Sequence, residues 1–137
     1  APVIGVEEVP RECVSRYGIV AGDLVADRTY RITEMIEKPS PAEAPSNLAI
    51  GARYILTPDI FEEIDRTPRG KGGEIQLTDA MQLLRAKREM YSYHFKGRRH
   101  DIGNKLDFLK TTVEFAIHRP DLGPAFRAFL KELAATL

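Results

Sequence analysis

Residues 18–39 read GIVAGDLVADRTYRITEMIEKP, and this stretch decides the fold. Two runs within it, Gly18–Val25 and Tyr30–Ile36, have the composition of strands, and the second alternates apolar and polar side chains as a half-exposed strand does. Because the runs are close in sequence, they predict an antiparallel hairpin. Ala21-Gly22-Asp23 predicts a turn that interrupts the first run. Glu37-Lys38-Pro39 ends the second run, because proline does not continue a regular strand.

The segments on either side of the hairpin alternate between strand and helix patterns. Further strands are expected at Pro2–Val9, Asn47–Leu56 and Met90–Phe95, and helices from Thr57 to near Thr67 and over Leu77–Lys87, Lys105–His118 and about Asp121–Ala135. Polar connections are expected at Pro10–Tyr17, Ser40–Ser46 and Arg69–Gly73. This order predicts one α/β or α+β domain over residues 1–137, with a mixed sheet flanked by helices.

Local signals mark the ends and faces of the expected helices. Thr57 and Asn104 are typical N-cap residues, and Pro120 ends the helix that begins after Asn104. Apolar side chains at helical spacing predict core or packing faces, among them Met81, Leu84, Leu106, Leu109 and Phe129.

Composition excludes several classes of partner. The 20 lysines and arginines balance the 20 acidic residues, so no basic stripe for nucleic acid is expected. The short basic cluster Lys96–His100 is typical of a solvated turn, and phosphate binding is the alternative. A single cysteine, Cys13, excludes an internal disulfide and fits a reducing cytoplasm. No apolar run approaches the roughly 20 residues that span a bilayer, and no signal peptide is recognised, so we expect a cytoplasmic protein without a membrane partner.

The chain starts with Ala1-Pro2-Val3, without a methionine, and runs straight into a strand pattern. We therefore expect a piece of a longer protein. A sheet divided in this way would expose an unpaired edge and apolar surface, which predicts self-association. The sequence also contains no glycine-rich phosphate loop, so only half of a nucleotide site is expected here.

The acid and the lysine at the end of the second run suit a sugar phosphate. The Glu37 carboxylate can accept hydrogen bonds from two vicinal hydroxyls, and Lys38 supplies a point charge for a phosphoryl oxygen. Neighbouring side chains of a regular strand point to opposite faces, so the strand must end or twist here for both to meet one ligand. A surface ion pair at a strand end is the alternative interpretation.

Three further segments are candidates for the same site. Asp101 precedes an expected helix and is either an Asx-type turn residue or a ligand for Mg²⁺, which commonly takes one or two carboxylates. Gly18 begins a strand and either allows a ligand close to the backbone or forms a simple bend. The segment Gly72–Asp79 is explained mostly as a loop that leads into a capped helix, with Thr78 and Asp79 suited to its first turn.

Taken in order, these segments resemble the C-terminal half of the bacterial UTP–glucose-1-phosphate uridylyltransferases, which belong to the sugar nucleotidyltransferases. The resemblance runs through Val6–Pro10, Arg16–Val20, Glu37–Pro39, Pro45–Tyr54, Gly73–Asp79 and Asp101–Leu106. The Ser-Asn-Leu-Ala and Gly-Glu-Ile-Gln-Leu-Thr-Asp stretches are more specific than Glu-Lys-Pro, which is shared more widely among sugar nucleotidyltransferases.

The resemblance implies a Rossmann-like α/β fold and a Mg²⁺-dependent enzyme that forms UDP-glucose and pyrophosphate from UTP and glucose 1-phosphate. It assigns Gly18, Glu37 and Lys38 to the sugar phosphate: Gly18 offers its backbone to the glucose ring, Glu37 accepts glucose hydroxyls, and Lys38 is the catalytic contact to the phosphate. It assigns Asp101 to the metal. The C-terminal region contributes to subunit contacts in this family, so a homo-oligomer is expected.

The chain departs from the family in two respects. The N-terminal half, with the glycine-rich loop and the first metal aspartate, is not in this sequence. The family pattern Asp-Cys-Gly-Asp-Lys reads Asp101-Ile102-Gly103-Asn104-Lys105 here, which keeps the metal aspartate and a good N-cap. Two alternatives stay open: a non-catalytic sugar-phosphate-binding or oligomerisation module, and a related pyrophosphorylase for another nucleotide or sugar.

Overall fold

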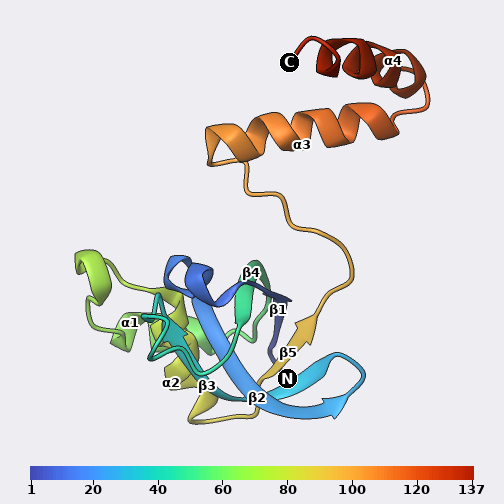
Figure 1. The fold of residues 1–137 in the computed structure, drawn as a ribbon. Coiled ribbons are helices and arrows are strands. Elements are labelled where there is room, and N and C mark those ends of the chain that lie inside the picture. Colours follow the sequence, from blue (N-terminus) through green and yellow to red (C-terminus); the bar gives the residue numbers. More distant parts are fainter. The chain divides into compact units, whose positions relative to one another are not determined.

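The computed structural model describes residues 1–70 and 72–137, which fall into two compact units, Ala1–Lys96 and Gly97–Leu137 (Figure 1). The first unit contains β1 (Val3–Glu8), the 3₁₀ helix η1 (Arg11–Arg16), β2 (Gly18–Ala26), β3 (Thr29–Glu37), β4 (Leu48–Ile55), α1 (Ile60–Arg66), α2 (Leu77–Arg85) and β5 (Tyr91–His94). The second unit contains α3 (Lys105–His118) and α4 (Gly123–Ala134), which pack against each other. The fold is therefore a mixture of strands and helices, as the sequence predicts.

The strands of the first unit form a closed barrel in the order β1-β4-β2-β3-β5. The barrel closes because β5 pairs with both β1 and β3. The β1–β5 pair is parallel and the other pairs are antiparallel, so the prediction of a mixed sheet is confirmed. The predicted unpaired edge is wrong for the described strands, because each of them has a neighbour on both sides.

The predicted hairpin is β2–β3, but its turn is elsewhere. Strand β2 continues through Gly22, and the pairing register with β3 shifts between Ala21 and Gly22. A Cβ atom at Gly22 would lie 2.3 Å from the backbone oxygen of Arg31, so glycine is required by close strand approach. The turn that joins the strands includes Arg28, which has a φ of +55°. The prediction of a turn at residues 21–23 is therefore wrong, because a bulge glycine and a turn glycine look alike in sequence.

We expect the substitution Gly22→Ala to lower the free energy of unfolding by about 1–3 kcal/mol, the usual cost of overpacking. The new methyl group would force the backbone of β3 away from β2. Denaturation by urea, followed by circular dichroism, measures the change. Leu24→Ala is the control, because the Leu24 side chain on the same strand is 66% exposed. Equal stability of the two variants would contradict the close approach at Gly22.

The main core lies between the barrel and the helices α1 and α2. Helix α2 packs on β3, and α1 packs on α2 (Figure 1). The predicted inner face of α2 is confirmed, since Met81 and Leu84 are fully buried. A second apolar cluster surrounds η1, where Val14 is fully buried. The expected polar connection at residues 10–17 is therefore a helical turn that packs on the barrel through Val14, with Cys13 and Tyr17 partly buried beside it.

The two predicted N-caps have different outcomes. The Asn104 side chain accepts hydrogen bonds from the backbone N–H groups of Leu106 and Asp107, at 2.9 and 3.2 Å, so that N-cap is confirmed. The Thr57 hydroxyl instead donates to the Asp59 side chain, and α1 begins at Ile60. The predicted start of this helix is too early because the Thr57 side chain turns to its neighbour two residues on.

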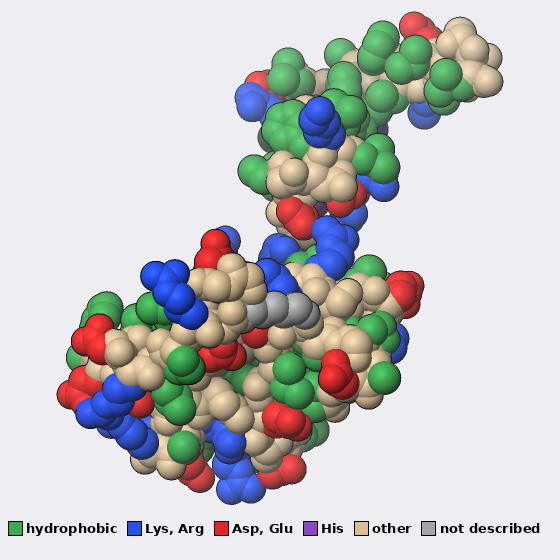
Figure 2. All heavy atoms as spheres, turned by 90° about the vertical axis from the view of Figure 1, so that its left-hand side faces the viewer, with side chains coloured by type: hydrophobic (Ala, Val, Ile, Leu, Met, Phe, Trp, Pro, Cys, Tyr) green, Lys and Arg blue, Asp and Glu red, His purple; other side chains and the backbone are tan. Residues whose placement is uncertain are grey.

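Within the second unit, helices α3 and α4 leave much of their apolar surface exposed. Hydrophobic side chains are prominent on the second unit in the space-filling view (Figure 2). Leu106 and Leu109 of α3 are 59% and 60% exposed, and Phe129 of α4 is 53% exposed. Of the two predicted interpretations, a core or a packing face, the second unit shows a packing face, since α3 and α4 contact each other without burying these positions in a core of that unit. No described helix combines the length and the apolar composition that crossing a bilayer requires.

Candidate functional site

Strand β3 ends where β2 begins, and the first turn of α2 reaches the same place. Gly18, the first residue of β2, pairs with Glu37, the last residue of β3. Thr78, the second residue of α2, forms a hydrogen bond with Glu37. We call the group of Gly18, Glu37, Lys38 and Thr78 the strand-end site. The structure thus brings together three residues that the sequence predicts and one that it assigned only to a helix start.

The Glu37 carboxylate has two different surroundings. The Thr78 hydroxyl donates to its Oε2 atom at 2.6 Å, while its Oε1 atom lies 3.9 Å from the Nζ atom of Lys38. The Glu37 side chain is 15% exposed, whereas that of Lys38 is 45% exposed. One carboxylate oxygen is therefore tied to the protein and the other lies beside a cation that solvent can reach.

Lys38 has an unusual backbone conformation that sets the direction of its side chain. Its φ is +47°, in the left-handed region, and its backbone N–H donates to the Tyr17 carbonyl at 3.0 Å. Successive side chains of a strand alternate in direction, and this turn ends that alternation after Glu37. The predicted end of the strand is confirmed. A non-glycine residue in this region costs about 1–3 kcal/mol, and such strain concentrates at functional sites.

Gly18 leaves the space in which the acid and the hydroxyl meet. A Cβ atom at this position would lie 2.9 Å from each of three side-chain atoms: Glu37 Oε2, Thr78 Oγ1 and Ile50 Cδ1. Gly18 is also buried. From the sequence, Gly18 either allows a ligand close to its backbone or forms a simple bend. The structure adds a second reason for glycine, because any side chain here would displace the carboxylate and the hydroxyl.

The segment after Pro39 is held by hydrogen bonds from two other elements. Arg11 of η1 donates to the backbone oxygens of Ala44 and Ser46, at 2.7 and 3.1 Å. The Ser46 hydroxyl donates to the Val20 carbonyl of β2 and accepts from the backbone N–H of Leu48 at 2.9 Å. Ser46 therefore joins β2 to β4, which gives the first residue of the Ser-Asn-Leu-Ala stretch a structural role close to the strand-end site.

Tyr54 of β4 interacts electrostatically with Glu37 of the strand-end site. Partial burial raises the pKa of its phenol, and the negative charge of Glu37 raises that pKa further. The phenol therefore stays protonated at neutral pH and remains a hydrogen-bond donor. In the sequence, Tyr54 is only the last residue of the Pro45–Tyr54 stretch, and nothing in its local sequence points to Glu37.

Asp101 belongs to the second unit, where its local structure is a turn. Its Oδ1 atom accepts a hydrogen bond from the backbone N–H of Gly103 at 3.2 Å, as in an Asx turn. Among the residues that the structure describes, no three His, Cys, Asp or Glu side chains form a group that could hold a metal ion. The structure therefore shows the Asx-turn alternative for Asp101, and its role as a Mg²⁺ ligand stays a prediction.

Two residues of the basic cluster at 96–100, Arg98 and His100, have partners within the second unit. Arg98 forms an ion pair with Glu114 of α3, and the His100 ring lies 5.3 Å from the ring of Phe115. The Nδ1 atom of His100 is 3.0 Å from the Thr111 hydroxyl. These contacts favour the solvated-turn interpretation over a phosphate site. Acidic and basic side chains are also interspersed on the face of the first unit that Figure 2 shows.

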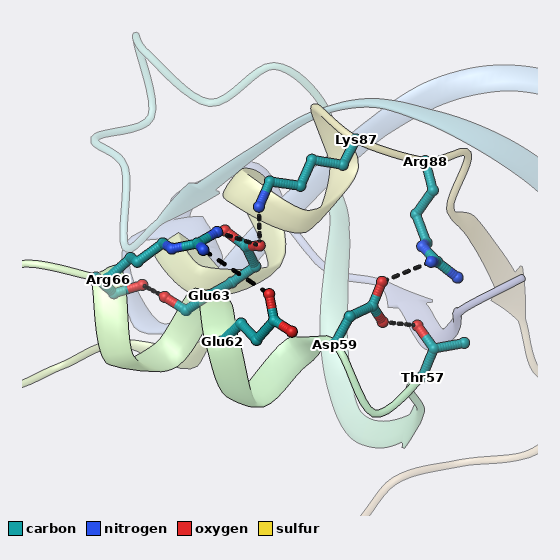
Figure 3. A network of polar contacts seen from close by, with 8 residues as sticks. Thr57, Asp59, Glu62, Glu63, Arg66, Lys87 and Arg88 are labelled. Carbon is teal, nitrogen blue, oxygen red and sulfur yellow. Dashed lines mark hydrogen bonds and ion pairs between the residues drawn. The ribbon is translucent and has the colours of Figure 1, made fainter.

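A second polar cluster joins α1 to the end of α2 (Figure 3). The Glu63 side chain is only 3% exposed and forms ion pairs with Lys87 and with Arg66, the latter at 3.4 Å. Arg88 pairs with Asp59 at 2.6 Å. Each of these cations has an acidic partner, so the cluster holds the two helices together. It thereby fixes α2, whose other end carries Thr78.

The chain matches known proteins over most of its length. The model of the nucleotidyl transferase family matches residues 3–116. A UTP–glucose-1-phosphate uridylyltransferase of Staphylococcus epidermidis is 44% identical over 131 residues, which are 96% of this chain and 46% of that protein. A protein of Methanocaldococcus jannaschii named putative UTP–glucose-1-phosphate uridylyltransferase is 46% identical over 135 residues, which are 98% of this chain and 47% of that protein.

Solved structures agree with the sequence relatives. A UDP-glucose pyrophosphorylase complexed with UDP-glucose superposes with a TM-score of 0.83 at 40% identity, over 87% of this chain and 45% of that chain. A UTP-bound UGPase of Acinetobacter baumannii gives a TM-score of 0.83 at 36% identity, over 97% of this chain and 46% of that chain. The chain therefore spans less than half the length of the relatives that it matches.

Proposed function

Because the chain belongs to the nucleotidyl transferase family, we propose that it carries the sugar-phosphate half of a UTP–glucose-1-phosphate uridylyltransferase. The proposed enzyme converts UTP and glucose 1-phosphate into UDP-glucose and pyrophosphate. The identity of 44–46% to proteins of that name supports the assignment. The matched proteins are about twice as long as this chain, so we assign the nucleotide half of the site to residues outside it.

The observation that carries the proposal is the asymmetric Glu37 carboxylate beside Lys38. Oε2 is held by Thr78, whereas Oε1 lies 3.9 Å from the Lys38 ammonium. An acceptor for hexose hydroxyls therefore lies next to a cation for the phosphate of the same ligand. Gly18 lets the carboxylate and the Thr78 hydroxyl pack against its backbone, and we assign that backbone to the glucose ring.

The proposed step is an in-line transfer of the uridylyl group. A phosphate oxygen of glucose 1-phosphate bonds to the α-phosphorus of UTP, and the bond from that phosphorus to the bridging oxygen breaks, so that pyrophosphate leaves. No general base is needed, because the sugar phosphate is already an anion. Lys38 neutralises part of the charge as the two polyanions approach, and Glu37 and Gly18 orient the sugar.

We assign Asp101 to hold Mg²⁺ in the full-length enzyme. The metal would supply charge neutralisation at the phosphates of the nucleotide. We also propose that the enzyme is cytoplasmic and homo-oligomeric. The single cysteine fits a reducing compartment, and the exposed apolar side chains of α3 and α4 are suited to a subunit contact.

Release of pyrophosphate tests the proposal. The full-length protein is mixed with UTP, glucose 1-phosphate and Mg²⁺, and the 137-residue chain is treated in the same way. We expect release from the full-length protein, and only binding of glucose 1-phosphate by the chain alone. No release from the full-length protein with any sugar phosphate would contradict the assignment.

A second candidate is a sugar-phosphate-binding module without catalysis. It is favoured for this chain by itself, because the sequence holds the strand-end site but no glycine-rich phosphate loop. Binding of glucose 1-phosphate without pyrophosphate release, by the 137-residue chain and by the full-length protein alike, would support this candidate. Release with another nucleoside triphosphate or another sugar phosphate, but not with UTP and glucose 1-phosphate, would instead support a related pyrophosphorylase.

A further inference from the structure

We infer that Thr78 is a positioning residue, which fixes one oxygen of Glu37 so that the other is presented to the sugar. This inference rests on the proposed function, because it concerns how Glu37 meets the hydroxyls of glucose 1-phosphate. Neither the sequence motifs nor the match to the family assigns this role to Thr78. Its hydroxyl is 41 residues from Glu37 in sequence and 2.6 Å from it in the structure.

The hydrogen bond between Thr78 and Glu37 has a defined direction. A carboxylate only accepts, so the hydroxyl of Thr78 donates its single proton to Oε2. A donor–acceptor distance of 2.6 Å is within the range of charge-assisted O–H···O⁻ bonds. Oε2 is thereby engaged, and Oε1, beside Lys38, is the oxygen to which a sugar hydroxyl donates.

The Thr78 hydroxyl has little freedom to move. The residue is 6% exposed, and the helix that carries it is anchored by Met81 and Leu84, which are fully buried in the core. Glu37 is the last residue of a strand paired with β2. Because both groups are on rigid elements, the carboxylate is already oriented before a ligand arrives, which lowers the entropic cost of binding.

Gly18 shows that the hydroxyl and the carboxylate share one confined space. A Cβ atom there would lie 2.9 Å from both Thr78 Oγ1 and Glu37 Oε2. Movement of Glu37 away from Thr78 would therefore also change how the carboxylate packs against Gly18. Thr78 acts through Glu37. Removing the Thr78 hydroxyl should therefore weaken binding of the sugar more than binding of the phosphate.

Calorimetric titration of the 137-residue chain with glucose 1-phosphate and with inorganic phosphate tests the inference. Thr78→Val keeps the shape of the side chain and removes the hydroxyl, whereas Thr78→Ser keeps the hydroxyl. We expect Thr78→Val to raise the Kd for glucose 1-phosphate about tenfold, which corresponds to about 1.4 kcal/mol. We expect the Kd of Thr78→Ser for glucose 1-phosphate to stay within about twofold of that of the unsubstituted chain. We expect Thr78→Val to leave the affinity for inorganic phosphate unchanged, because the hydrogen bond that it removes is to Glu37, which binds the sugar.

Thr67→Val is the matched control. Thr67 is 5% exposed, and its hydroxyl donates to the Glu63 backbone oxygen at 2.6 Å in α1, so the substitution removes an equally buried hydroxyl outside the strand-end site. Equal Kd values for Thr78→Val and the unsubstituted chain would overturn the inference, as would equal weakening by Thr78→Val and Thr67→Val. Glu37→Gln separates the role of Thr78 from the proposed function. Weaker binding of glucose 1-phosphate by Glu37→Gln but not by Thr78→Val overturns the role of Thr78 alone. No binding of glucose 1-phosphate by the unsubstituted chain overturns the proposed function as well.

Discussion

Replacing Lys38 with methionine is expected to lower the turnover of the full-length enzyme about 100- to 1000-fold, the loss typical of removing one charge-stabilising group from a reacting centre. Methionine keeps the unbranched stem and removes the ammonium. The Lys38 Nζ atom lies 3.9 Å from Glu37 Oε1, so it would meet the phosphate of a sugar that donates to Glu37. Steady-state pyrophosphate release measures the change, and we expect kcat to fall more than the affinity for glucose 1-phosphate.

Lys110→Met is the matched control for this substitution. Lys110 also lies 3.9 Å from a carboxylate oxygen, that of Asp107, and its side chain is 56% exposed on α3. We expect this variant to retain the turnover of the unsubstituted enzyme. Near-normal turnover of the Lys38→Met variant, with the fold intact by circular dichroism, would remove Lys38 from the reacting centre.

Gly18→Ala is expected to raise the Kd for glucose 1-phosphate about 10- to 100-fold, since displacing the carboxylate weakens a hydrogen bond to a charged group, worth about 1.5–3 kcal/mol. The added Cβ atom would lie 2.9 Å from Glu37 Oε2 and Thr78 Oγ1, so both groups must shift and their hydrogen bond must lengthen. The crowded atoms are side-chain atoms, so we expect the fold to survive. Calorimetric titration and thermal unfolding of the same sample separate binding from stability.

Gly5→Ala is the control for crowding in the barrel. A Cβ atom at Gly5 would lie 3.1 Å from the Cβ atom of Arg53, between β1 and β4. We expect this variant to bind glucose 1-phosphate as the unsubstituted chain does. Unchanged binding by the Gly18→Ala variant would show that the ligand does not use the acid and the hydroxyl beside Gly18.

The elements could be predicted from sequence wherever the signal is local. Alternation over Tyr30–Ile36 predicts β3, the stop at Pro39 predicts its end, and Asn104 predicts the start of α3, and the structure contains all three. Each of these signals comes from a few neighbouring residues. The closure of the barrel could not be predicted in this way, because β5 pairs with β1 from the other end of the first unit.

The roles of residues whose partners are distant in sequence could not be predicted from local signals either. Gly22 predicts a turn from its neighbours, yet its role is set by the backbone oxygen of Arg31 on the facing strand. Thr78 has the local signature of a helix start, and only the fold places its hydroxyl on Glu37. The sign of φ at Lys38 is equally hidden, because lysine has no preference for the left-handed region.

Titration of the isotope-labelled chain with glucose 1-phosphate, followed by amide NMR spectra, tests most directly whether the strand-end site binds a sugar phosphate. The account predicts saturable shifts of the amide signals of Gly18, Lys38 and Thr78, with little change at Lys87 and Arg88 beside the structural ion pairs. Shifts confined to other segments, or no shifts at concentrations that saturate the full-length protein, would contradict it.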